Sequence, residues 1–226
     1  MRKIAFIAFT ALPLFAGFFP STVNTSVANI SGQNITMNSS FPVTGMSGII
    51  IHNYGNTVKA ITSRIVQTSP GHAKLSGNDV IQHDELPTIN TAVSRGDKII
   101  GGYLYQNVLL LAPDANTYAK VTGSHNKHWI HPDLYALYLS QEGEGTPNRK
   151  NLADFAKKFH VGLVYIIKKN AAVLLDPISG KYVNKKGVGA LPSKAKFPFF
   201  MRFDKIDSGW FSKSASGTYY NLMETL

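Results

Sequence analysis

Short β-branched runs separated by turn residues fill the first half of the chain and constrain its fold more than any other feature. The clearest run is Gly48–Tyr54, after which Gly55-Asn56 predicts a tight turn into a second strand over Val58–Val66. A later run, Lys98–Leu104, is expected to return through a short turn along Val108–Ala112. About five to seven short strands at this spacing, without a good helix, predict a small β-barrel or sandwich.

The hydrophobic period changes after the middle of the chain. Pro132 and Asp133 predict the start of one helix, and Thr146-Pro147 predicts a second one with Thr146 as its N-cap. Three strands are expected next, at Val161–Ile167, Ala171–Leu175 and Lys181–Val183. The short turns between these strands favour a mostly antiparallel sheet. The second module is therefore predicted as helix-helix-strand-strand-strand, and the fold class as α+β.

These patterns divide the chain into four parts. The last part is rich in aromatic residues, and this density predicts that it packs on the modules or on a partner. The predicted parts are a signal peptide at 1–22, a β-rich module at 23–115, an α+β module at 116–193 and the aromatic segment at 194–226.

The N-terminus carries a targeting signal. Arg2 and Lys3 precede an apolar run from Ile4 to Phe19, which predicts a secretory signal peptide. The alternative is an uncleaved membrane anchor, but the run is short for a membrane span. No small-x-small pair follows the run directly, and Ser26 and Ala28 are the candidates further along. We expect an exported protein of the periplasm, outer membrane or cell surface.

Lysines dominate the charged residues, and the formal net charge is +10. The absence of cysteine excludes disulfides, thiolate zinc sites and cysteine nucleophiles. For an exported protein, the charge favours acidic proteins, envelope glycans or anionic lipids over nucleic acid as partners, and the alternative is a solvated basic surface with no single partner. The predicted partner-binding residues are Lys168, Lys169, Lys181, Lys185, Lys186, Trp210 and Phe211.

No constellation typical of catalysis stands out, so we predict no catalytic residue, no cofactor and no enzyme. A nucleophile elbow and a phosphate-binding glycine loop are absent, and the carboxylates of Asp84-Glu85 are expected on a solvated turn. His125, His128 and His131 are spaced three residues apart, with Asp133 nearby. We interpret them as a polar loop with a helix cap, and a transition-metal site is the alternative.

Several segments resemble a known family. They are Trp129–Leu139, Thr146-Pro147, Leu152–Val183, Gly45–His52, Leu86–Thr88, Gly96-Asp97, Tyr103–Tyr105 and Leu110–Pro113. Together they resemble the N-terminal domain of the plasminogen-binding surface proteins of spiral, flagellated Gram-negative bacteria. The resemblance covers residues 28–206 and is most specific in the run that begins at Trp129. It implies an envelope or surface location and a binding role.

The resemblance departs from the family pattern at the end of the chain. Plasminogen-binding members are longer, with a charged region and a C-terminal lysine that can enter kringle lysine pockets, whereas this chain ends at Leu226. Internal lysines such as Lys185-Lys186 are then the expected alternative. We predict a non-enzymatic envelope interaction protein that binds an envelope protein or host plasminogen and can form a homo-oligomer. The alternatives are a structural subunit of a periplasmic machine, such as a flagellar motor or secretion apparatus, and an enzyme acting on envelope glycans.

Overall fold

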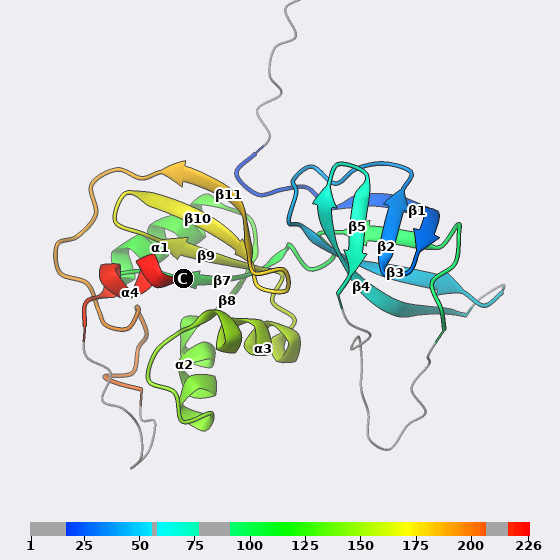
Figure 1. Cartoon of the computed structure of the whole chain (residues 1–226). Helices are drawn as coiled ribbons and strands as arrows, with labels where there is room; N and C mark the ends of the chain where they lie inside the picture. Colours follow the sequence, from blue (N-terminus) through cyan, green and yellow to red (C-terminus); the bar gives the residue numbers. More distant parts are fainter. Residues whose placement is uncertain (1–16, 56–57, 77–90, 207–216) are drawn as a thin grey trace, which may run out of the picture.

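Two β-sheets lie side by side in the computed structural model, and helices pack against the second one (Figure 1). The structure describes residues 17–55, 58–76, 91–206 and 217–226. The first sheet contains β1 (Val23–Ser31), β2 (Asn34–Met37), β3 (Ser47–Asn53), β4 (Lys59–Ser69), β5 (His72–Leu75) and β6 (Lys98–Gly101). The second contains β7 (Asn107–Leu111), β8 (His128–Ile130), β9 (Leu163–Ile167), β10 (Ala171–Asp176) and β11 (Lys181–Gly187). The helices are α1 (Ala115–Ser124), α2 (Pro132–Gln141), α3 (Arg149–Phe159) and α4 (Tyr219–Thr225).

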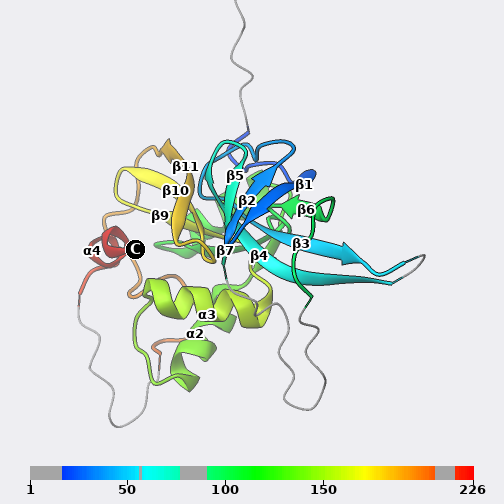
Figure 2. The same cartoon turned by 45° about the vertical axis from the view of Figure 1, so that its right-hand side comes forward.

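The first sheet is a closed antiparallel barrel with the strand order β1-β2-β5-β4-β3-β6. Ile35, Ile50, Ile65 and Ile99 are buried inside it, because inward-facing residues alternate with outward-facing ones along each strand. The hairpin of β3 and β4 extends beyond the barrel as an arm (Figure 2). The prediction of a small β-barrel is therefore confirmed.

The second sheet has the order β11-β10-β9-β7-β8. The pairings among β9, β10 and β11 are antiparallel, whereas β7 pairs in parallel with both β8 and β9. The α+β class is confirmed. The predicted hairpin between 98–104 and 108–112 is wrong, because β6 closes the barrel and β7 crosses into the second sheet. Residues 108–111 are all buried, as expected for a central strand that is covered on both faces.

The helices α2 and α3 confirm the two predicted helices, but α3 begins later than its predicted cap. Its N-cap is Asn148 rather than Thr146, and Asn148 and Asn151 each accept a hydrogen bond from the other's backbone N–H. The helices α1 and α4 were not predicted. In the first of them, Asp114 caps the helix by accepting from the backbone N–H of Thr117 at 2.7 Å. The sequence of α1 carries only a weak apolar stripe, and none of its residues is fully buried, so the apolar spacing that predicts a helix is missing.

The two faces of the second sheet belong to different cores. Val108, Leu110, Leu163, Tyr165 and Leu174 face the core that is continuous with the barrel interior. The opposite face packs against α2, α3 and α4, and its buried strand residues are Leu109, Leu111, Val164, Ile166, Val173 and Leu175. In the described part of the chain, no helix is long and apolar enough to cross a membrane.

A buried carboxylate joins the barrel to the second sheet. The side chain of Asp176, at the end of β10, accepts from the backbone N–H of Ser47 in β3 and from the hydroxyl of Tyr105, each at 2.7 Å. Burial, and then the negative charge of Asp176, raise the pKa of Tyr105, so its hydroxyl stays protonated and donates. The modules are therefore held in one orientation by a polar contact as well as by the shared core.

The aromatic segment packs on the second sheet through the residues that the structure describes. Phe199 and Tyr219 are fully buried, and the hydroxyl of Tyr219 donates to the carbonyls of Leu111 and Ile167, each at 2.8 Å. Trp210 and Phe211 lie outside the described residues.

Candidate functional site

Lysine side chains gather where β9 turns into β10, beside α4. Lys168 follows the apolar strand β9 and is largely buried. Its ammonium group lies 3.0 Å from the hydroxyl of Tyr182 and 3.7 Å from a carboxylate oxygen of Glu224. Arg149 and Lys168 also approach the ring of Tyr182, at 5.0 and 5.1 Å from its centroid. The ammonium group of Lys168 is thus held in place by its surroundings.

Around this anchored lysine lies a hollow of about 340 Å³. Lys169 and Lys185 on its rim are exposed to solvent. The helix α4 supplies the opposite wall, including the half-exposed carboxylate of Glu224. We refer to this site as the lysine hollow, and its lining residues are Lys168, Lys169, Asn170, Ala171, Lys185, Tyr220, Asn221 and Glu224.

The other two predicted binding lysines lie elsewhere. Lys186 follows Lys185 along β11 and therefore points to the opposite face of the sheet, where its ammonium group lies 4.2 Å from the ring centroid of Phe18. Lys181, at the start of β11, is exposed and lies beside Gly45 of the barrel. The structure thus brings together Lys168, Lys169 and Lys185, and it separates Lys181 and Lys186 from them.

The three histidines have separate surroundings. The His125 ring packs 5.1 Å from Phe19, the His128 ring lies 3.3 Å from the side-chain oxygen of Asn107, and His131 caps α2 by accepting from the N–H of Asp133 at 3.2 Å. Within the described ranges, no group of three or more His, Cys, Asp or Glu side chains is placed to hold a metal ion.

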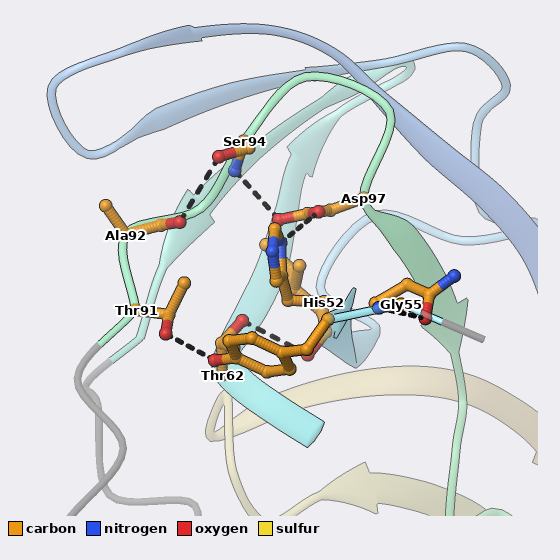
Figure 3. Close-up of polar contacts among 10 residues, drawn as sticks. His52, Gly55, Thr62, Thr91, Ala92, Ser94 and Asp97 are labelled. Carbon is orange, nitrogen blue, oxygen red and sulfur yellow. Dashed lines mark hydrogen bonds and ion pairs between the residues drawn. The ribbon is translucent and has the colours of Figure 1, made fainter. Parts of the chain in front are cut away.

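A histidine and an aspartate that were not predicted as site residues form a pair on the barrel (Figure 3). The Nδ1 atom of His52 lies 2.7 Å from one carboxylate oxygen of Asp97, and the other oxygen accepts from the backbone N–H of Ser94 at 2.8 Å. Tyr54 packs on the imidazole with 4.7 Å between ring centroids. Among the described residues, no Ser or Thr hydroxyl bonds to the other ring nitrogen, which is where a catalytic triad places its nucleophile. The pair joins the end of β3 to the turn before β6.

We expect Asp97→Ala to lower the free energy of unfolding by about 2 kcal/mol, because the side chain of Asp97 is buried and two partly buried hydrogen bonds to its carboxylate are lost. Urea unfolding followed by circular dichroism measures this change. His72→Ala, at an exposed barrel histidine, is the control and should change the value by less than about 0.5 kcal/mol. An Asp97→Ala protein as stable as this control would show that the pair does not stabilise the barrel.

Taken together, the chain is an α+β protein in which a barrel is joined to a mixed sheet that presents anchored and exposed lysines. It belongs to the family described as "Plasminogen-binding protein pgbA N-terminal", whose sequence model matches residues 22–226. The resemblance predicted from the sequence is confirmed.

Two curated relatives share this region. Both are named "Plasminogen-binding protein PgbA", from Helicobacter pylori strains J99 and 26695. Each is 24% identical over 180 residues, which cover 79% of this chain and 38% of the relative. The match thus spans well under half of the length of these relatives. No solved structure matches the chain significantly.

Proposed function

We propose that this chain is an exported, non-enzymatic interaction domain that binds plasminogen, with the lysine hollow as its contact surface. The observation that carries the proposal is the family match over residues 22–226, which includes both modules, together with the plasminogen-binding names of the relatives. Export to the periplasm or the cell surface is part of the proposal and is supported by the basic and apolar N-terminus.

The lysine hollow offers the groups that a lysine-binding partner needs. A pocket that takes up free lysine must satisfy one ammonium group and one carboxylate on the same ligand. Lys169 and Lys185 present exposed ammonium groups, and the carboxylate of Glu224 lines the same hollow. Internal side chains can therefore supply both charges from a fixed surface, whose position is set by the buried anchor Tyr219.

The test is surface plasmon resonance of the full chain, exported and purified, over immobilised plasminogen. We expect saturable binding that 6-aminohexanoate, a lysine analogue, abolishes. The double substitution Lys169→Ala with Lys185→Ala should weaken binding about tenfold or more, as truncation of central interface residues commonly does.

A matched control separates the hollow from general charge. Lys59→Ala with Lys74→Ala removes the same two charges from exposed positions on the barrel and should change affinity less than about twofold. Equal losses in the two double variants would assign binding to net charge, and binding that persists in 6-aminohexanoate would exclude recognition through lysines.

A further inference from the structure

The first described residues of the chain pack on the second sheet before the chain enters the barrel. The ring of Phe18 lies 5.2 Å from that of Tyr165, edge to face, and the ring of Phe19 lies 5.1 Å from His125 and 6.4 Å from Trp129. Both phenylalanines contact the core that the sheet shares with the barrel. Such edge-to-face pairs stabilise a fold beyond the apolar area that they bury.

Two lysines lie over these rings. The ammonium group of Lys186 is 4.2 Å from the centroid of Phe18, and that of Lys127 is 4.6 Å from the centroid of Phe19. Burial lowers the pKa of both lysines, and burial followed by the charges of Lys186 and Lys127 lowers the pKa of His125. The phenylalanine faces thus offset part of the desolvation of the cations beside them.

Hydrogen bonds fix the backbone of the same segment at both ends. The side-chain amide of Asn184 in β11 donates to the carbonyl of Phe18 at 2.7 Å, and the hydroxyl of Thr22 donates to the carbonyl of Gly102, after β6, at 3.0 Å. Pro20 between them is buried. Residues 17–22, which we refer to as the clasp, therefore run from the second sheet to the barrel (Figure 1).

The packing of the clasp limits the positions at which a signal peptide can be cleaved without disrupting the fold. A cut after residue 22 would detach both phenylalanines and expose Tyr165 and Trp129. A cut after Ser26 or Ala28 would do more damage, because the whole pairing of β1 with β6 is made by Val23–Ser26. The barrel would then lose its closure and gain two unpaired edges.

We propose that the signal peptide is cleaved before Phe18, directly after Ala16 or Gly17, so that the clasp is the first segment of the mature domain. This proposal rests on the proposed export. A cut after Ala16 or Gly17 places a small residue directly before the scissile bond, which is one of the two positions of the small-x-small pattern, and these are the last small residues before Phe18.

The test is the intact mass and N-terminal sequence of the full chain after expression and export in a Gram-negative host. The expected first residue is Gly17 or Phe18. A mature protein that begins at Phe19 or later would overturn the proposed cut and leave export supported. A protein that still begins at Met1 would overturn both the cut and the proposed export.

Stability tests the clasp independently of the leader. In the processed protein, Phe18→Ala with Phe19→Ala should lower Tm by about 10 °C, because two half-buried rings are lost. Phe203→Ala removes an exposed ring of the aromatic segment and is the matched control, with an expected change below about 2 °C. A double variant with the Tm of this control would overturn the clasp.

A measurement on the unchanged protein covers the case in which the double variant does not fold. Chymotrypsin cleaves after phenylalanine, so under native conditions the bond after Phe18 should resist it. A product that begins at Phe19 while the rest of the chain stays intact would show that the segment is not held against the sheet.

Discussion

Asp176→Ala is expected to lower the free energy of unfolding by roughly 4 kcal/mol, because four donors would lose a buried acceptor. One carboxylate oxygen accepts from Ser47 and Tyr105, and the other accepts from the backbone N–H groups of Ile178 and Ser179 at 2.9 and 3.0 Å. The side chain is fully buried. The loss should also loosen the barrel from the second sheet, since Ser47 belongs to one and Asp176 to the other.

Thermal unfolding followed by circular dichroism measures the effect, and the expected fall in Tm is about 8–16 °C. Asp154→Ala is the control, because this carboxylate is partly exposed and pairs with Lys150 on the surface of α3, so its loss should cost less than about 0.5 kcal/mol. Asp176→Asn should fall between the two, since its amide group faces donors whichever way it turns. A change below about 1 kcal/mol for Asp176→Ala would mean that the junction is held by apolar packing alone.

Local signals were sufficient for much of the fold. The turn at Gly55 and the β-branched runs around it predicted the hairpin of β3 and β4, and Pro132 predicted the first turn of α2. These elements depend on residues near in sequence, where backbone preferences and the spacing of apolar residues act directly.

The sheet to which a strand belongs was not a local property. The run at 107–111 suits the barrel as well as the second sheet by its composition, and its parallel partners β8 and β9 lie further along the chain, after α1 and after α3. The short strand β8 and the helix α1 likewise owe their stability to the surface that they cover, which short-range patterns do not contain. The change of sheet after β6 therefore could not be predicted from the run itself.

The candidate site likewise has one feature that the local sequence could have predicted and one that it could not. Lys185 and Lys186 are neighbours in the sequence, but successive strand residues point to opposite faces, so one lines the hollow and the other covers Phe18. Strand alternation within β11 could have predicted this separation. The contribution of Glu224 could not be predicted, because it depends on α4 docking some forty residues further along the chain.

Gly162→Ala is expected to prevent stable folding or to lower the free energy of unfolding by more than about 3 kcal/mol, as forced overpacking of a core can. A Cβ atom at this position would lie 2.0 Å from the carbonyl oxygen of Leu104 and 2.7 Å from the backbone nitrogen of Tyr105. Both contacts are backbone atoms of the connection between the modules, so no side chain can turn aside. The N–H of Gly162 also donates to the carbonyl of Asn107 at 3.0 Å, which holds the two segments at this distance.

The same substitution at Gly123 should have the opposite sign. Gly123 lies in α1, and a Cβ there would meet no atom within 4 Å. Alanine is favoured over glycine in a helix by up to about 1 kcal/mol, so Gly123→Ala should raise the stability slightly. Soluble yield and thermal unfolding of the two variants provide the measurement. If Gly162→Ala were as stable as Gly123→Ala, the backbone at 102–107 would have to move away from β9, and the close contact between the connection and the second sheet would not be a requirement of the fold.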